Sequence, residues 1–123
     1  MERVQAIRGA TTVAADTREE ILAATRELIT ELIGRNNLDP RQVISAYFTA
    51  TPDLTGAFPA EAVRQLGYTD WAALDSVEMA VSGALPRCIR VLVHAYFDWG
   101  QEVSHVYLRE AKSLRRDRVD CGD

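Results

Sequence analysis

Thirteen residues in the second half of the chain, PRCIRVLVHAYFD (86–98), constrain the fold more than any other stretch. Apolar side chains occupy every second position, and this period of two predicts a β-strand with one buried face. Arg90 stands on the opposite face, between Cys88 and Leu92, and its guanidinium is always charged. The run therefore raises the question of which anion a fixed cation on this strand would meet. The buried face would comprise Ile89, Val91, Val93, Ala95 and Phe97.

Two helices are predicted. Residues 18–33 follow a T-x-x-E capping box that starts at Thr17, and they carry apolar side chains at helical spacing. Gly34 is expected to follow this helix as its C′ residue, because glycine readily adopts the left-handed conformation found there. The second helix is predicted to begin at Pro59 and to end at Gly67.

Four further strands are predicted from short runs of β-branched, aromatic or alternating residues. The first alternates Val4 and Ala6 with polar neighbours, and residues 10–16 follow it as a connector. Asp39 precedes the second strand as an N-cap candidate, with Pro40 directly behind it. The predicted strands are 3–8, 43–50, 68–74 and 102–108, and residues 75–81 stay open between strand and loop.

The predicted element order, β-α-β-α-β-β-β, indicates an α/β (α+β) fold. We expect a single domain over residues 1–123, with a mixed sheet packed on helices and a charged tail that frays from about residue 116. Helices on one side of the sheet leave its other face open. An apolar open face has to be buried against another subunit, so the pattern favours an oligomer.

Composition and charge exclude several functional classes. With 47% hydrophobic and 26% charged residues, the chain can bury a core. Its net charge of −4 argues against broad nucleic-acid binding, which needs a basic face. No stretch has transmembrane length and the N-terminus lacks a signal-peptide pattern, so we expect a cytoplasmic protein without membrane contacts. Cys88 and Cys121 show no metal-binding or redox spacing, and no disulfide is expected between them.

The common catalytic motifs are absent. The sequence has no GxGxxG, P-loop, HExxH or GxSxG motif, and His94 and His105 lack the neighbours of a metal or catalytic site. For Arg90, an ion pair with Glu78 or a position facing solvent is the simplest explanation, and Tyr107 can be an amphipathic residue at the core edge. Cationic and hydroxyl donors at strand ends can equally form a pocket for a small dicarboxylate.

Four blocks of the sequence resemble the signature blocks of a known family. They are AIRGATTV (6–13), TATPDLTGAFPAEAVRQLG (49–67), LPRCIRVLV (85–93) and HVYLREAKSLR (105–115). In this order and spacing, the chain resembles chorismate mutases of the small trimeric α/β class, and not those of the all-helical class. The resemblance implies a homotrimer that forms a pseudo-α/β barrel, with active sites at the subunit interfaces.

The activity that the resemblance implies is the rearrangement of chorismate to prephenate, on the route to phenylalanine and tyrosine, without a cofactor or metal. This [3,3]-sigmatropic (Claisen) shift takes place within one molecule and needs neither a nucleophile nor an acid–base pair. An enzyme can accelerate it by selecting the folded conformer of the substrate and by placing fixed charges where charge develops.

The resemblance also implies roles for individual residues. Arg90 would donate to the ether oxygen and to a carboxylate, and Glu78 would lie near the ring hydroxyl and the developing positive charge. Arg8 and Tyr107 would bind a carboxylate and hold the folded conformer. Further substrate contacts would come from Leu74, Asp75, Ser76 and Val77, from Phe58, Ala60 and Arg64 of a neighbouring chain, and from Leu114 and Arg115, which would close over the mouth.

Two positions depart from the family pattern. Residue 75 is Asp, where the family carries Cys or another small polar residue. Its carboxylate would either repel a dianionic substrate or accept a hydrogen bond from the substrate hydroxyl. Glu61 stands where a lysine is familiar, which weakens a cationic rim. An alternative function stays open, namely a non-catalytic trimeric binding protein for a small carboxylated metabolite, although such a protein would not need Glu78.

Overall fold

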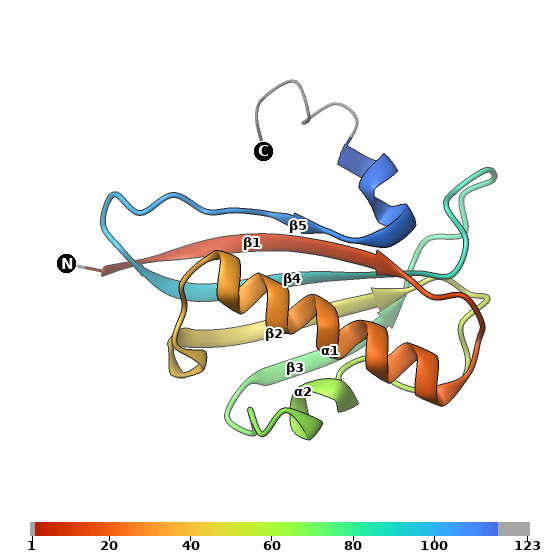
Figure 1. Ribbon diagram of the computed structural model, residues 1–123, viewed down its shortest axis with the longest axis horizontal. Helices are drawn as coiled ribbons and strands as arrows, with labels where there is room; N and C mark the ends of the chain where they lie inside the picture. Colours follow the sequence, from red (N-terminus) through yellow and green to blue (C-terminus); the bar gives the residue numbers. More distant parts are fainter. Residues whose placement is uncertain (1, 116–123) are drawn as a thin grey trace.

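The structure is a computed structural model that describes residues 2–115, and its strands form one five-stranded mixed sheet in the order β3-β2-β4-β1-β5 (Figure 1). The predicted order of helices and strands is confirmed. The elements are β1 (Glu2–Thr12), α1 (Arg18–Arg35), η1 (Pro40–Gln42), β2 (Val43–Ala50), α2 (Glu61–Gln65), β3 (Ala72–Val77), β4 (Cys88–Asp98), β5 (Val106–Tyr107) and η2 (Arg109–Arg115), where η denotes a 3-10 helix.

β4 is the central strand of the sheet. It pairs antiparallel with β1 on one side and with β2 on the other, while β3 and β5 add to the two edges in parallel. The pairing with β4 continues as far as Thr12, so residues 10–12 of the predicted connector belong to β1. The predicted buried face of β4 is confirmed, because its five apolar side chains are 0–3% exposed: Ile89, Val91, Val93, Ala95 and Phe97.

The two faces of β1 are reversed with respect to the prediction. Ile7 is buried, whereas Val4 is 50% exposed and Ala6 is exposed beside it. Val4 and Ala6 therefore lie on the open face of the sheet together with Arg8. The apolar pattern is misleading here because Gly9, which contributes no side chain, occupies the next position of the buried face.

α1 begins as predicted and ends two residues later. The Thr17 hydroxyl accepts a hydrogen bond from the Glu20 backbone N–H at 3.1 Å, which confirms the cap. Gly34 lies inside the helix, and Asn36 follows it as the C-cap. The left-handed position falls on Asn37, with φ +52°, because asparagine tolerates that conformation better than most side chains.

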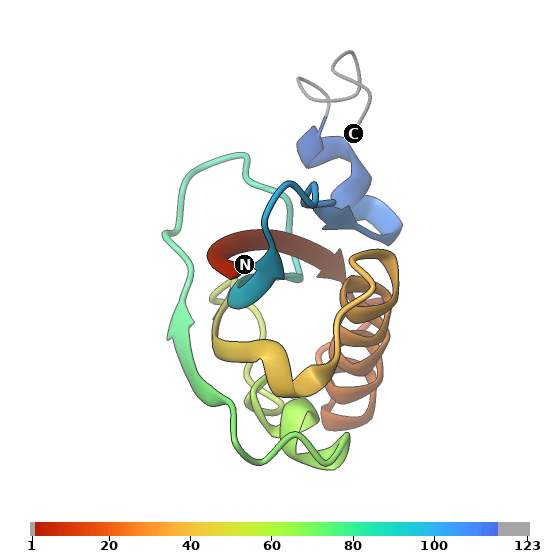
Figure 2. The same ribbon diagram turned by 90° about the vertical axis from the view of Figure 1, so that its left-hand side faces the viewer.

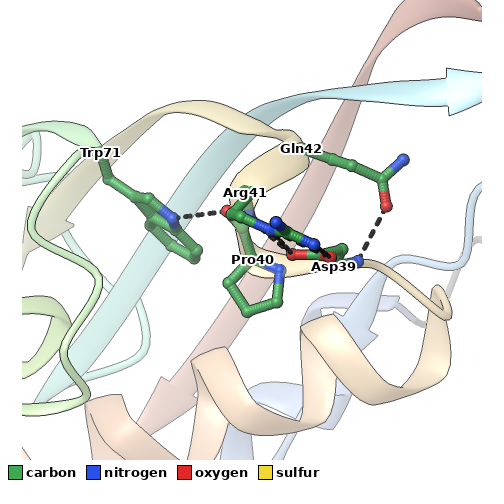
Figure 3. Close-up of polar contacts among 5 residues, drawn as sticks. All are labelled: Asp39, Pro40, Arg41, Gln42 and Trp71. Atoms are coloured by element: carbon green, nitrogen blue, oxygen red, sulfur yellow. Dashed lines mark hydrogen bonds and ion pairs between the residues drawn. The ribbon is translucent and has the colours of Figure 1, made fainter.

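The turn before β2 forms as the sequence predicts (Figure 3). Asp39 caps η1 by accepting the Arg41 N–H at 2.9 Å, and the Gln42 side chain accepts the Asp39 N–H at 2.8 Å. Hydrogen bonds from Arg41 lower the pKa of Asp39 to about 2. Trp71 donates from Nε1 to the Pro40 carbonyl at 2.9 Å, so this turn is linked to the residue just before β3.

α2, β3 and β5 also differ from their predicted limits. α2 is short because Pro59 and Ala60 form a turn before it. β3 begins at Ala72 and includes the first residues of the undecided stretch 75–81. β5 is only two residues long, since the chain before it is held by a side chain instead of a strand. Asn36 accepts the Ser104 N–H at 2.7 Å and donates to the Ser104 carbonyl at 2.9 Å.

Both α-helices lie on the same face of the curved sheet (Figure 2). The core lies between them and the buried face of β4. The opposite face presents large apolar side chains that are 42–66% exposed: Val4, Tyr47, Leu74 and Tyr96. The chain therefore has the open apolar face that its pattern predicts.

We expect Gly9→Ala to destabilise the fold, because a Cβ at this position would lie 3.1 Å from Val91 Cγ1 and 3.2 Å from Leu28 Cδ1. Overpacking of this kind lowers the free energy of unfolding by about 1–3 kcal/mol. The matched control is Gly34→Ala, where a Cβ meets open space and helix propensity should raise stability by about 0.5–1 kcal/mol. Denaturant unfolding at one protein concentration measures both, and equal stability of Gly9→Ala and wild type would contradict this packing argument.

Candidate active site

Arg90 lies in the middle of the open face. On β4 it pairs with Ala10 of β1 on one side and with Thr49 of β2 on the other. Leu92, two residues further on, pairs with Arg8. Because residues two apart in a strand share a face, the pairing places Arg8 and Arg90 on the same side of adjacent strands. The Arg90 side chain is 50% exposed in the single chain.

Glu78 is held beside Arg90 from both its backbone and its side chain. Its N–H donates to the Ala50 carbonyl at 2.8 Å, which continues the β2–β3 pairing by one residue. Its Oε1 accepts the Thr49 hydroxyl at 2.6 Å and lies 3.5 Å from Arg90 Nε. The ion pair offered as one explanation of Arg90 is therefore present. A guanidinium has five N–H donors, so a contact through Nε leaves donor capacity for a ligand.

Five of the predicted site residues line one cavity of about 380 Å³ on this face. Two of them are the cations Arg8 and Arg90, and the carboxylate of Glu78 is the third. We call this cavity the Arg90 pocket. The remaining two, Tyr107 and Leu114, come from β5 and η2 at the end of the described chain.

β5 is fixed next to Arg8 by a histidine as well as by strand pairing. Tyr107 pairs with Ala10 of β1, and the Leu108 N–H donates to the Ala10 carbonyl at 2.9 Å. The Arg8 N–H donates to His105 Nδ1 at 2.9 Å, so this ring nitrogen carries no proton. His105 thus provides an acceptor where a regular strand would use a carbonyl.

The other predicted contacts lie elsewhere on the chain. A second cavity, of about 640 Å³, lies beside α2 and is lined by Phe58, Asp75, Ser76 and Val77; we call it the Phe58 pocket. The N–H of Ala60 donates to Asp75 Oδ1 at 2.9 Å. Arg64 is exposed on α2, Leu74 is exposed on β3, and Arg115 ends η2 with its side chain outside the described part of the chain.

Strand alternation separates Asp75 from the Arg90 pocket. Asp75 pairs with Phe48, which is buried on the helix side of the sheet, whereas its neighbour Ser76 pairs with Thr49 on the open side. The carboxylate of Asp75 therefore faces the loop before α2 and binds the Ala60 N–H there. Consecutive strand residues point to opposite faces, so Leu74 and Ser76 lie on the open side of the sheet and Asp75 lies on the helix side.

Burial raises the pKa values of two side chains near the pockets. Burial raises the pKa of Asp75, although the Ala60 N–H and the Arg64 charge act in the opposite direction. Burial also raises the pKa of the Cys88 thiol, which keeps it protonated and inert as a nucleophile. Cys121 lies outside the described residues, so the expectation about a disulfide remains a prediction.

Two polar residues of the Arg90 pocket were not assigned a role from the sequence. Tyr47 and Thr49 line the cavity, and Thr49 is the hydrogen-bond donor that orients Glu78. Both stand on the polar side of a strand that the sequence predicts. Their position on an open face next to Arg90 follows from strand order, which the sequence pattern does not contain.

The chemical character of the Arg90 pocket is that of an anion site with one ordered carboxylate. Within residues 2–115, no group of three or more His, Cys, Asp and Glu side chains is arranged to hold a metal ion. None of the helices in that part of the chain is long and apolar enough to cross a bilayer. Two guanidinium groups and a tyrosine can bind carboxylates and stabilise a developing negative charge.

Comparison with known proteins gives a consistent result. The model of the family described as chorismate mutase type I matches residues 4–118. The chain is 49% identical to chorismate mutase AroH of Thermus thermophilus over 93% of its length and 95% of that protein. It is 42% identical to chorismate mutase AroH of Bacillus subtilis (strain 168), over 93% and 91%.

A solved structure agrees with these sequence matches. The fold superimposes on a chorismate mutase from Clostridium thermocellum with a TM-score of 0.87 and 45% identity, covering 89% of this chain and 99% of the other. The resemblance and the fold class read from the sequence are thereby confirmed. The chain belongs to the chorismate mutase type I family and is, by that membership, an isomerase.

Proposed function

We propose that this chain converts chorismate to prephenate by conformer selection and electrostatic stabilisation in the Arg90 pocket, as part of phenylalanine and tyrosine biosynthesis. The observation that supports it most directly is the meeting of Arg8, Glu78, Arg90 and Tyr107 at one cavity. These four residues come from four different strands or strand ends. Family membership supports the same reaction.

The reaction determines which groups are useful. A C–O bond breaks while a C–C bond forms, so the ether oxygen gains negative charge and the ring gains positive charge. No proton is transferred and no covalent intermediate with the protein forms, so no cofactor or metal is required. The protein contributes by holding the reacting carbons close and by supplying preorganised charges.

Arg90 and Glu78 form the electrostatic part of the proposed mechanism. Glu78 contacts Arg90 at Nε and is itself bonded to Thr49, so the guanidinium is ordered before substrate binds. Its further N–H groups donate to the ether oxygen and to a substrate carboxylate. Glu78 stands near the ring hydroxyl and the developing positive charge. One preorganised donor to a developing oxyanion supplies about 3–4 kcal/mol, a large part of the roughly 8 kcal/mol at the low end of enzymatic catalysis.

Arg8 and Tyr107 supply the binding part of the proposed mechanism. Both line the Arg90 pocket, and the pairing of β5 with β1 keeps Tyr107 next to Arg8. A guanidinium and a phenol can hold one carboxylate by charge-assisted hydrogen bonds. Leu114 provides an apolar wall, and Arg115 follows it at the mouth. These contacts favour the folded conformer because they fix the substrate's carboxylates relative to its ring.

The active enzyme is proposed to be a homotrimer with sites at the subunit interfaces, each chain contributing one domain. The exposed apolar residues of the open face support a covering partner, since an apolar face of this extent is usually buried. The Phe58 pocket is a separate cavity in the single chain, and in the proposed trimer its residues Phe58, Asp75, Ser76 and Val77 would contact substrate held in the Arg90 pocket of a neighbouring chain. Ala60, Arg64 and Leu74 accompany them on the same chain.

A cytosolic location belongs to the same proposal. Cys88 is a buried free thiol, and free thiols persist in reducing compartments. The alternative function, a binding protein without catalytic activity, is less well supported because Glu78 is held by three contacts in a pose that binding of a dianion alone would not favour.

We predict that Arg90→Ala lowers kcat about 10²- to 10³-fold, the loss typical of one donor to a developing oxyanion. Arg90→Lys should also be poor, because an ammonium cannot reach both acceptors of a forked contact. The loss of chorismate absorbance in the ultraviolet measures turnover without added metal. Circular dichroism serves as the control for folding, since residue 90 is half exposed. Near wild-type turnover of Arg90→Ala would refute the assigned role, and an inactive wild type would favour the binding protein.

Shared sites predict complementation between two damaged chains. Arg90→Ala and Arg64→Glu should each be nearly inactive as pure proteins. When the two are denatured together and refolded, about a quarter of the interfaces in random trimers combine an intact Arg90 with an intact Arg64. We expect about that fraction of wild-type activity and, for wild type, a mass of three chains in analytical ultracentrifugation. If each site lies within one chain, mixing will restore nothing.

Asp75→Asn tests how the carboxylate acts on the substrate. Asparagine can still accept the Ala60 N–H but carries no charge. Two like charges about 7 Å apart in water repel by about 0.6 kcal/mol, so removing one should lower KM about threefold at neutral pH. Because the pKa of Asp75 is raised, wild type loses this charge as pH falls through that pKa, and the two KM values should converge there. A higher KM for Asp75→Asn would identify the carboxylate as an acceptor for the substrate hydroxyl.

A further inference from the structure

The residues from 107 to 114 carry two walls of the Arg90 pocket, at their first and last positions. We call them the 107–114 segment. Strand pairing holds only its beginning, because β5 is two residues long and pairs with β1 at two positions. The rest of the segment is η2, a 3-10 helix, which is a weakly cooperative structure by itself. Something else must therefore keep Leu114 in place.

Arg109 stands at the junction between β5 and η2 in a costly conformation. Its φ is +53°, in the left-handed region that favours glycine. A side chain held there costs about 1–3 kcal/mol and persists only when its surroundings require it. Arg109 turns the chain from the direction of β5 into η2, and its side chain makes contacts that glycine could not make.

The Arg109 guanidinium bridges two other elements. Its Nη1 donates to the Thr12 carbonyl at 3.1 Å, at the end of β1. Its Nε donates to Glu27 Oε1 at 3.2 Å, on α1. The two contacts use two different nitrogens of one planar group, so they fix its orientation as well as its position.

Thr12 anchors the next residue of the segment. Its hydroxyl accepts the Glu110 N–H at 3.3 Å, while its carbonyl accepts Arg109. Thr12 is only 5% exposed, and Ala111, the residue after Glu110, is fully buried. The junction is thus attached to β1 at a buried point. Beyond it, the Ser113 hydroxyl donates to the Glu110 carbonyl at 3.1 Å within η2.

We propose that Arg109 is a positioning residue, which holds the 107–114 segment over the Arg90 pocket through Thr12 and Glu27. This inference rests on the proposed function. It assigns Arg109 no contact with substrate: it acts through Tyr107 and Leu114. Once the folded conformer is bound, these residues contact the ground state and the transition state alike, so their displacement raises KM and leaves kcat nearly unchanged. The contacts of Arg109 go to β1 and α1, whereas Arg90 and Glu78, which set kcat, lie in β4 and directly after β3.

The main test is a series at Arg109. We expect Arg109→Gln, Arg109→Lys and Arg109→Gly each to raise KM for chorismate about five- to tenfold, with kcat within about twofold of wild type. Lysine fails because its single nitrogen cannot reproduce two donor nitrogens held apart in one rigid plane. The glycine variant separates the effect of the side-chain contacts from that of the backbone conformation. Glycine readily adopts φ +53° but makes neither contact. A wild-type KM for Arg109→Gly would overturn the proposal.

Variants at Thr12 and on α1 supply matched controls. Thr12→Val removes the hydroxyl with little change of volume and should raise KM, whereas Thr12→Ser keeps the hydroxyl and should restore it. Arg35→Gln breaks the Arg35–Glu31 pair, which is similarly exposed but joins two residues of α1 and does not include the 107–114 segment, and should leave KM unchanged. A KM rise with Arg35→Gln equal to that with Arg109→Gln would show a general charge effect and overturn the proposal.

Limited trypsin digestion gives a readout that does not depend on activity. Mass spectrometry of cleavage after Lys112, an exposed residue of η2, should show faster cutting in Arg109→Gln and Thr12→Val than in wild type and Arg35→Gln. An inactive wild type would refute the proposed function. The cleavage rates would still test whether Arg109 holds the 107–114 segment in place. Equal rates in Arg109→Gln and wild type, or a fall of kcat and thermal stability together with the rise in KM, would overturn the positioning role.

Discussion

The pairing of β4 between β1 and β2 is the constraint on which the rest of the structure depends. Its register places five apolar side chains against α1 and leaves Arg90 on the opposite face. A slip of one residue would turn the guanidinium into the core and the apolar residues outward, because strand side chains alternate. An unpaired buried charge is far more costly than an exposed one. The same burial that stabilises the fold therefore fixes the direction of the cation that the chemistry needs.

Under the proposed function, the open face of a single chain holds only part of the active site. The Arg90 pocket offers cations, a tyrosine and a carboxylate, whereas the Phe58 pocket lies on another part of the surface. Asp75, Ser76 and Val77 at the end of β3 all line the Phe58 pocket, whereas Glu78, directly after them, lines the Arg90 pocket. A neighbouring copy that covers the apolar open face would bring the second set of residues to the first. Assembly and catalysis would then depend on the same surface.

Charge is distributed locally in this acidic chain. The net charge is −4, yet the Arg90 pocket combines two guanidinium groups with one carboxylate that also orders Arg90. The departure at position 61 is compensated within the chain. Glu61 forms an ion pair with Arg18 of α1, and its pKa is lowered mainly by that hydrogen bond. It links the two helices, so little of its charge is available to repel an anion.

The sequence by itself determined the order of strands and helices, the buried face of β4 and the cap at Thr17, because these depend on local periodicity and local hydrogen bonds. Through a resemblance it also predicted Arg8, Glu78, Arg90 and Tyr107 as site residues, which the structure brings to one cavity. The prediction was wrong for the faces of β1, where Gly9 contributes no apolar side chain to the buried face. It was also wrong for the length of β5, where hydrogen bonds between Asn36 and Ser104 take the place of strand pairing. Only the tertiary structure decided which predicted residues meet, that Thr49 orients Glu78, and that Arg109 bridges β1 and α1. Those contacts join residues far apart in the sequence, and spacing along the chain carries no information about them.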